Sequence, residues 1–524
     1  MLRWVAACLA FLTCQTALAT VGFTFTAAYG AYPVGFRVVQ LHDPSRSYQD
    51  GTDAITGEVA AGAAERPIQT LIWYPAASPG RSLVYADYLD LAGNEDRFDL
   101  DKSQASHIAE AALREWIANG ASPADVARIR AQPVHATGEA PLASGTFPLI
   151  VYAPSDSSSA FENDVLCEYL ASHGYVVLAS PSHGAHVRYM TDGRLPNDLE
   201  NTRAQAADIG FLIGYAHELP NVDASKVGVV GYSWGGMAST FAAAADSRIR
   251  ALVDLDGSVR YFPKLLAAAP DVTPDRIHVP LLFFADQEDP LVPRKDSQPN
   301  SFIDRIHHAD VTEIGLRKLT HDDLSADSLR FLASIHHGGT TAEQRNISYG
   351  WVARYTVAFL DAVLKHDANA EAFMAATPAA NHVPPDTLAI QYRLSQGPSP
   401  SYAGFAQALA EHGFDQAIAA YVAYTRLHPD FHITPDSIDP WIFSLMNQAK
   451  FHEAVDLAQL AVHLTPKNAS AWSELAWAYD VANQPKDALE SYGHVLAIDP
   501  HNASAAERIK ALRSSQRHSS DGGS

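Results

Sequence analysis

The chain has 524 residues, which is too many for one ordinary domain, so two or more domains are expected. Hydrophobic residues make up 47% of the sequence, enough for a large core. The formal net charge of -22 argues against nucleic acid or an anionic membrane as a partner.

The N-terminal segment has the pattern of a secretory signal peptide. Arg3 supplies a positive charge, Trp4 to Leu12 is apolar and too short to span a bilayer, and Ala17-Leu18-Ala19 is a small-x-small cleavage site. We expect residues 1–19 to be removed and the mature protein to be periplasmic or secreted; a retained N-terminal anchor is the alternative. Cleavage leaves Cys167 as the one cysteine, so no intramolecular disulfide is expected.

Residues 20–390 contain eight segments with the composition of buried strands, and helical patterns follow most of the later ones. Unbroken apolar strands that alternate with helices indicate an α/β domain, in which helices cover both faces of a mostly parallel sheet. The expected strands are Val34–Leu41, Ile68–Pro75, Pro148–Ala153, Tyr175–Ser180, Val227–Val230, Ala251–Asp256, Pro280–Ala285 and Glu313–Leu319.

Residues 87–145 depart from this alternation. Ala105–Asn119 and Pro123–Arg130 have helical patterns, and the remainder is polar. We therefore expect a helical insertion between the second and third strands. It is either a lid over a functional site or a decoration without a function.

The segment Gly231-Tyr232-Ser233-Trp234-Gly235 lies between an apolar β-branched run and a helical pattern of small residues. A G-x-S-x-G motif in this strand–turn–helix context predicts a nucleophile elbow rather than a structural turn. The flanking glycines allow strand and helix to cross closely. The hydroxyl of Ser233 is then exposed, and the N–H of Trp234 is placed to donate to an oxyanion.

A serine hydroxyl needs a neighbouring base, which in this kind of fold follows the last strand, in the chain order Ser, acid, His. His321 comes directly after the last predicted strand and is therefore the expected base. Four nearby histidines compete for this role. His307 and His308 precede that strand, in a helical pattern, and His336 and His337 lie beyond the following helix.

Two aspartates are candidates for the acid that orients the histidine. Asp256 ends the sixth predicted strand, and Asp289 follows the seventh. Both loops belong to the carboxyl edge of the sheet, where active sites of open α/β sheets form. The order along the chain does not choose between them.

The region from about Pro33 to Lys365 resembles α/β-hydrolases of the platelet-activating-factor acetylhydrolase and bacterial dienelactone-hydrolase type. In the acetylhydrolase branch the acid follows the sixth strand, so the resemblance implies Asp256, with Asp289 as the alternative from other branches. The matching segments are Asp43-Pro44-Ser45-Arg46, Arg66-Pro67-Ile68, Trp73-Tyr74-Pro75, Gly231-Tyr232-Ser233-Trp234-Gly235-Gly236, Leu255-Asp256-Gly257, Pro280-Leu281-Leu282-Phe283-Phe284 and Thr320-His321-Asp322-Asp323-Leu324.

The same resemblance implies a second oxyanion donor after the third strand. The family usually has a His-Gly pair there, whereas this chain has Pro154-Ser155-Asp156. By alignment the N–H of Asp156 joins that of Trp234 in the oxyanion hole, although an acidic side chain there repels an oxyanion unless it points away. His183 either lines the pocket or is an ordinary loop histidine.

From Pro398 onward strands stop and helical patterns repeat. Pro466 and Pro500 are separated by the 34-residue period of tetratricopeptide repeats. We expect three repeats and a capping helix at Ala503–Leu512, within residues 398–513, followed by a disordered tail at residues 514–524. Such stacks often bind peptides, and a packing or self-association module is the alternative.

These features together predict an exported serine carboxylic-ester hydrolase that acts through Ser233, His321, Asp256 and an acyl-enzyme. The alternatives are a prolyl-oligopeptidase-like serine peptidase and a catalytically dead scaffold for the repeats. This chemistry needs no cofactor, and no His/Asp cluster has metal-ligand spacing. The expected substrates are small-molecule, lipid or polymer esters, and the repeats are the place for a protein partner.

Overall fold

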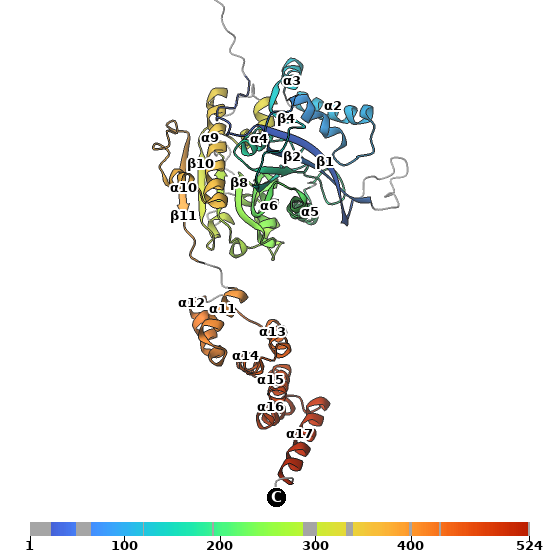
Figure 1. Cartoon of the computed structure of the whole chain (residues 1–524), viewed down its shortest axis with the longest axis vertical. Helices are drawn as coiled ribbons and strands as arrows, with labels where there is room; N and C mark the ends of the chain where they lie inside the picture. The colour runs from blue at the N-terminus through green and yellow to red at the C-terminus, as the bar shows by residue number, and fades with distance from the viewer. Residues whose placement is uncertain are drawn as a thin grey trace, which may run out of the picture. The chain divides into compact units, whose positions relative to one another are not determined.

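The computed structural model describes residues 22–48, 64–118, 120–190, 193–286, 301–331, 339–397, 401–428 and 431–521. The chain divides into two compact units, Met1–Gly397 and Pro398–Ser524 (Figure 1). The signal peptide predicted at residues 1–19 lies outside the described residues, as do Asp289, His336 and His337.

The first unit is built around one eleven-stranded sheet with the strand order β11-β10-β9-β8-β7-β5-β6-β2-β1-β4-β3. The six strands from β10 to β6 run parallel, and β11 and β2 flank them in the antiparallel direction. The strands are β1 Val34–Tyr48, β2 Ala64–Pro75, β3 Arg81–Val84, β4 Pro133–Gly138, β5 Phe147–Ala153, β6 Val176–Ala179, β7 Val222–Tyr232, β8 Ile249–Leu255, β9 Leu281–Ala285, β10 Val311–Leu316 and β11 Leu388–Arg393.

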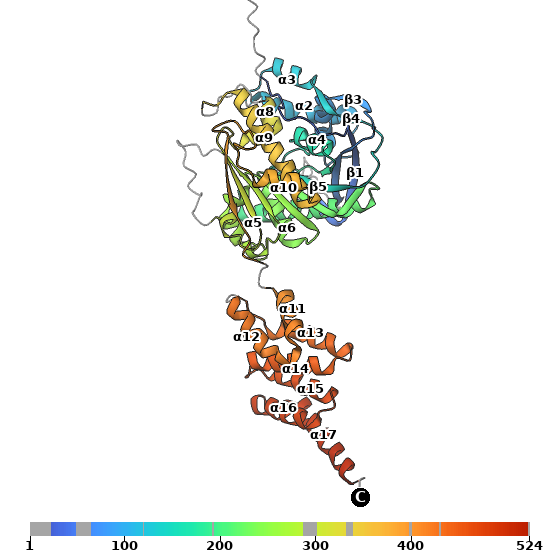
Figure 2. The ribbon, with the colours of Figure 1, turned by 60° about the vertical axis from the view of Figure 1, so that its left-hand side comes forward.

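Helices cover both faces of this sheet, so the central strands are buried on both sides (Figure 2). Alternate residues of β5 enter the two cores, Ile150 and Tyr152 on one face and Leu149 and Val151 on the other. One face packs α4 (Asp164–Ser172), α8 (Ala326–Phe331) and α9 (Ala342–Leu360), and the other packs α5 (Leu195–Tyr215), α6 (Trp234–Ala245) and α7 (Pro263–Ala267).

All eight predicted strands are present, but three further strands were not predicted. β4 lies inside the insertion and pairs in parallel with β1, so residues 87–145 are not purely helical. The insertion also contains α1 (Tyr85–Leu89, at its start), α2 (Lys102–Ala118) and α3 (Pro123–Arg130). β3 is a short edge strand, and β4 beside it is also short; both have exposed residues, which weakens the alternating pattern that identifies a strand.

The first unit extends beyond residue 390, where the sequence predicted its end. β11 pairs antiparallel with β10, from Val311↔Arg393 to Leu316↔Leu388, and α10 (Ala368–Ala375) precedes it. A second correction concerns His307 and His308, which follow a short 3-10 turn at Ile303–Arg305 and are not in a helix.

The second unit consists of helices: α11 packs against α12, α12 and α13 both pack against α14, and each later helix packs against the next. They are α11 Tyr402–His412, α12 Ala417–Leu427, α13 Pro435–Asn447, α14 Phe451–Leu464, α15 Ala469–Val481, α16 Pro485–Ile498 and α17 Ala503–Asp521. α17 is longer than the predicted capping helix, so residues 514–521 are helical rather than disordered. No Gly or Pro interrupts the chain between Ala503 and Asp521.

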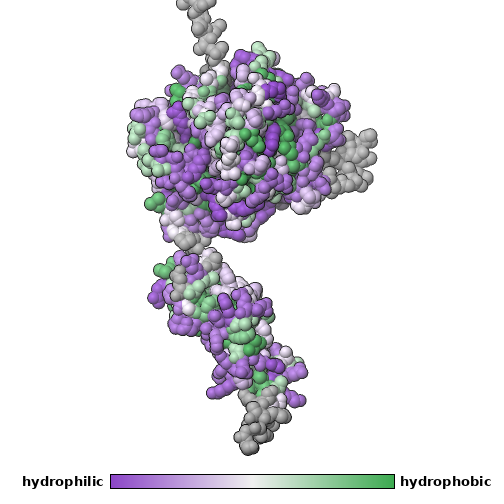
Figure 3. Space-filling view, in the orientation of Figure 1, coloured by the Kyte–Doolittle hydropathy of each residue, from purple (hydrophilic) through white to green (hydrophobic). Residues whose placement is uncertain are grey.

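The surface of the first unit is largely hydrophilic on the face drawn in Figure 3. Within the described ranges, no helix has both the length and the hydropathy that a membrane span requires.

Candidate active site

Ser233 lies at a sharp turn between β7 and α6. Its backbone has φ 54° and ψ -117°, a conformation that residues with a side chain rarely adopt. A Cβ added to Gly235 would lie 2.0 Å from the carbonyl oxygen of Ala153, and one added to Gly231 would lie 2.4 Å from that of Gly235. Both glycines are therefore required for the close crossing of β5, β7 and α6.

The structure brings Ser233, His321 and Asp256 into one hydrogen-bonded row. The Nε2 atom of His321 is 2.9 Å from the Oγ of Ser233, and its Nδ1 atom is 2.6 Å from the Oδ2 of Asp256. A tautomer with the proton on Nδ1 donates to Asp256 and leaves Nε2 free to accept the serine proton. The imidazole is thus oriented for general-base work.

The carboxylate of Asp256 is fully buried and held by further donors. The hydroxyl of Tyr261 donates to Oδ1 at 2.8 Å, and the N–H of Asp286 lies 3.4 Å from the same atom. The hydroxyl of Tyr232 donates to the carbonyl oxygen of His321 at 3.0 Å. Tyr232 and Tyr261 were not predicted as site residues, although each lies within five positions of a predicted one.

The surroundings of His321 favour its protonated form. Burial lowers the pKa of His321, but the hydrogen bond and negative charge of Asp256, with the charges of Asp322 and Asp286, outweigh burial and raise it above 6.5. A raised pKa makes the imidazole a stronger base for the serine proton.

A second aspartate lies buried directly beside the site. Asp254 is fully buried, and neither carboxyl oxygen has a hydrogen-bond partner of good geometry among the residues that the structure describes. A Cβ on Gly236 or Gly257 would lie 2.3 or 2.1 Å from its Oδ1. Burial, together with the charge of Asp256, raises the pKa of Asp254 well above its usual value, which favours the neutral acid.

The expected oxyanion donors belong to two adjacent segments at this edge of the sheet. Trp234 is the first residue of α6, so its N–H lies at the positive helix end without an intrahelical acceptor. The loop after β5 packs on the same helix, because a Cβ on Gly235 would lie 2.6 Å from the carbonyl oxygen of Pro154. The carboxylate of Asp156 accepts a hydrogen bond from the hydroxyl of Ser157 at 2.7 Å.

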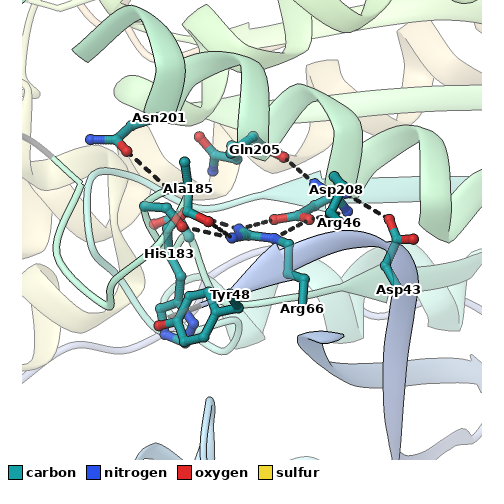
Figure 4. A network of polar contacts seen from close by, with 12 residues as sticks. Asp43, Arg46, Tyr48, Arg66, His183, Ala185, Asn201, Gln205 and Asp208 are labelled. Atoms are coloured by element: carbon teal, nitrogen blue, oxygen red, sulfur yellow. Dashed lines mark hydrogen bonds and ion pairs between the residues drawn. The ribbon is translucent and has the colours of Figure 1, made fainter. Parts of the chain in front are cut away.

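A buried ion network fixes the loop after β6 (Figure 4). Arg66 donates to both carboxylate oxygens of Asp208, at 2.8 and 2.6 Å, and Arg46 donates to one of them at 2.7 Å. Arg66 also donates to the carbonyl oxygens of His183, at 3.0 Å, and Gly184, at 2.6 Å. Arg46 and Arg66 thus position a loop that contacts the loop after β5, because Ser182 bonds to Ser155 and Ser158.

The side chain of His183 is buried and makes no bond to the triad. Its Nε2 atom lies 3.6 Å from the Oε2 of Glu95, which exceeds a hydrogen-bond distance. No group of three or more potential metal ligands occurs within the described ranges.

The sequence comparisons agree with a hydrolase. The model of the dienelactone hydrolase family matches residues 158–312, a segment that contains Ser233 and Asp256. A curated protein of Synechocystis sp., named "Putative carboxymethylenebutenolidase", is 24% identical over 168 residues, which are 30% of this chain and 68% of that protein.

Among solved structures, a ferulic acid esterase from Streptomyces cinnamoneus is similar to this chain with a TM-score of 0.41 and 19% sequence identity. The match covers 66% of this chain and 94% of the esterase. The family match and the curated relative support a hydrolase related to the dienelactone hydrolases.

Proposed function

We propose that the protein is a serine carboxylic-ester hydrolase with Ser233 as nucleophile, His321 as base and Asp256 as acid. The observation that carries this proposal is the row of two contacts, 2.9 Å from Ser233 Oγ to His321 Nε2 and 2.6 Å from His321 Nδ1 to Asp256 Oδ2, at a strained elbow. Nucleophile, base and orienting acid in such a row are the arrangement that acyl transfer needs.

The geometry supports a two-step reaction. Ser233 Oγ attacks the ester carbonyl while His321 Nε2 takes its proton, and the N–H groups of Trp234 and Asp156 hold the oxyanion. His321 then returns the proton to the leaving alcohol as the carbon–oxygen bond breaks. A water molecule, deprotonated by His321, then attacks the acyl-enzyme carbonyl. His321 returns this proton to Ser233 Oγ as the acyl–Oγ bond breaks and the acid is released. Asp256 stays ionised throughout and stabilises the imidazolium.

Esters are favoured over peptides as substrates. The curated relative is named for an activity on a butenolide, which is a cyclic ester, and the matching family is named for a lactone. A panel of p-nitrophenyl esters, a small unsaturated lactone and proline p-nitroanilides tests this choice. We expect turnover of the esters or the lactone, none of the anilides, and loss of turnover in Ser233→Ala. Turnover of the anilides alone would favour a peptidase. No turnover of any of these substrates would favour a catalytically dead scaffold.

We further propose that the protein is exported, with cleavage after Ala19. The basic, apolar and small-residue pattern of residues 1–19 supports this. The mass of the protein recovered from the periplasm or medium tests it, with Thr20 as the expected first residue. Full-length protein confined to the cytoplasm would contradict export.

We also propose that the second unit consists of tetratricopeptide repeats. The helix starts support this, because α12, α14 and α16 begin 34 residues apart, as do α13, α15 and α17. The repeats are the proposed site for a protein partner or for self-association, which sedimentation of the full chain and of a chain ending at Gly397 would separate.

A further inference from the structure

Two buried polar residues, Glu162 and Asn163, lie immediately before α4 and beside two loops of the catalytic edge. One loop follows β5 and carries Asp156. The other, residues 319–326, carries His321. The two loops are more than 150 residues apart in the chain, so their relative position depends on contacts between them rather than on the backbone.

Glu162 anchors the loop after β5. Its Oε2 accepts the backbone N–H of Ser155 at 2.8 Å, and its Oε1 accepts the Ser155 hydroxyl in a short hydrogen bond. These contacts fix Ser155, and the next backbone N–H in the chain is that of Asp156, the proposed oxyanion donor. The N–H and the hydroxyl of Ser155 both donate, and the carboxylate of Glu162 has only acceptors, so every group in this contact has a complementary partner.

Asn163 anchors the histidine loop. Its Nδ2 donates to the carbonyl oxygen of Leu324 at 3.0 Å, and its Oδ1 accepts the N–H of Ala326 at 2.8 Å. The hydroxyl of Tyr349 also donates to Oδ1, at 2.8 Å. These contacts hold the turn that directly follows His321. A fully buried amide with all these partners has one preferred position.

The hydroxyl of Tyr152, on β5, joins the two anchors. It accepts a hydrogen bond from Asn163 Nδ2 at 2.8 Å and donates one to Glu162 Oε2 at 3.3 Å. Burial, with the charge of Glu162, raises the pKa of Tyr152 well above its usual value, so the hydroxyl keeps its proton. A continuous hydrogen-bond chain therefore runs from the oxyanion loop to the histidine loop.

We propose that Glu162, Asn163 and Tyr152 are positioning residues that hold the oxyanion donor and the base in one arrangement. The inference rests on the proposed hydrolase function and adds residues that touch neither the substrate nor the reacting atoms. Removal of an anchor lets one loop shift relative to Ser233. A shift of about 1 Å in such a group costs about a hundredfold in rate, whereas substrate affinity depends mainly on other contacts.

The test compares variants of the proposed anchors with variants of a second buried hydrogen-bonded pair, Glu168 in α4 and Tyr88 in α1. Glu162→Met removes the acceptors at similar volume, Asn163→Ala removes the second anchor, and Tyr152→Phe removes only the joining hydroxyl. The matched controls are Glu168→Met and Tyr88→Phe, because Glu168 is equally buried but accepts from Tyr88 and from the N–H of His135 in the insertion. kcat and KM for p-nitrophenyl acetate are measured with the melting temperature.

We expect kcat to fall about 30- to 100-fold in Glu162→Met and Asn163→Ala and about threefold or more in Tyr152→Phe, with KM within about threefold of the wild type. Glu162→Gln, which keeps one acceptor oxygen, should recover most of the activity. The controls should lose melting temperature but keep kcat. If Glu162→Met does not fold, the kcat of Tyr152→Phe relative to that of the wild type tests the positioning role.

A folded Glu162→Met or a Tyr152→Phe protein with wild-type kcat would overturn the positioning role. An equal loss of kcat in the controls would also overturn it, because the effect would then be general destabilisation. A wild type without esterase activity contradicts the proposed function instead. The two failures are therefore distinguishable, since the positioning test compares variants with a wild type that is active and sensitive to Ser233→Ala.

Discussion

The two units of this protein are stabilised in different ways. Next to the proposed catalytic edge, the first unit buries charged and polar side chains that are paired, among them Arg66, Asp208 and Glu162. The second unit packs its helices through apolar side chains, with Leu457, Leu460 and several alanines fully buried. Buried polar groups are costly unless they are paired, and paired networks hold one geometry. The difference agrees with the proposal that the chemistry takes place in the first unit and that the second unit offers a binding surface.

This contrast predicts that changes of a few atoms matter in the first unit, whereas loss of the whole second unit is tolerated. The largest effect is expected at the acid. Asp256→Asn should lower kcat about a thousandfold or more, because an amide favours the wrong imidazole tautomer and removes the charge that stabilises the imidazolium. Steady-state kinetics on a p-nitrophenyl ester measure it.

Asp289→Asn is the comparison for this prediction, because Asp289 was the alternative acid in the sequence. It should cost much less than Asp256→Asn. The reverse ranking would place the acid after β9 and would contradict the contact between His321 and Asp256.

A smaller effect is expected from pH. His321 must be neutral to accept the serine proton, and its pKa is raised above 6.5, so kcat/KM should rise with pH through an apparent pKa above 6.5. Below that pKa each pH unit should cost about tenfold. The pH profile of kcat/KM for the wild type measures this pKa. An apparent pKa at or below 6.5 would contradict the expectation that Asp256 raises the pKa of His321 more than burial lowers it.

The smallest effect on chemistry is expected from removal of the second unit. A chain ending at Gly397 retains all eleven strands and every proposed catalytic residue. Its kcat for a small soluble ester should lie within about twofold of the full chain, since separate compact units usually fold alone. A folded but inactive truncated protein would show that the second unit completes the site.

The sequence was sufficient to predict the elements whose pattern is strong. The apolar runs predict the eight strands, because a strand buried on both faces has an unbroken apolar run, and the G-x-S-x-G motif predicts the elbow around Ser233. β3 and β11 were missed because they are edge strands with exposed residues, and β4 was missed because it is short and only partly buried. The continued helix at residues 514–521 was missed because a polar composition was interpreted as disorder.

The candidate site was predictable only where the chain order constrains it. Ser233 follows β7 and His321 follows β10, the last of the predicted strands, whereas the choice of Asp256 over Asp289 needed the family resemblance. Glu162 and Asn163 could not be predicted from their own surroundings in the sequence. Their partners, Ser155 on one side and Leu324 on the other, become neighbours only when β5 and β10 enter the same sheet.

The central claim is that Ser233 is an activated nucleophile. The most direct measurement is mass spectrometry of the full chain after treatment with a fluorophosphonate probe, with Ser233→Ala and His321→Ala as comparisons. We predict one covalent adduct, located on the peptide that contains Ser233, absent from Ser233→Ala and formed far more slowly in His321→Ala. A folded wild type that remains unlabelled, or an adduct on a different serine, would contradict the account.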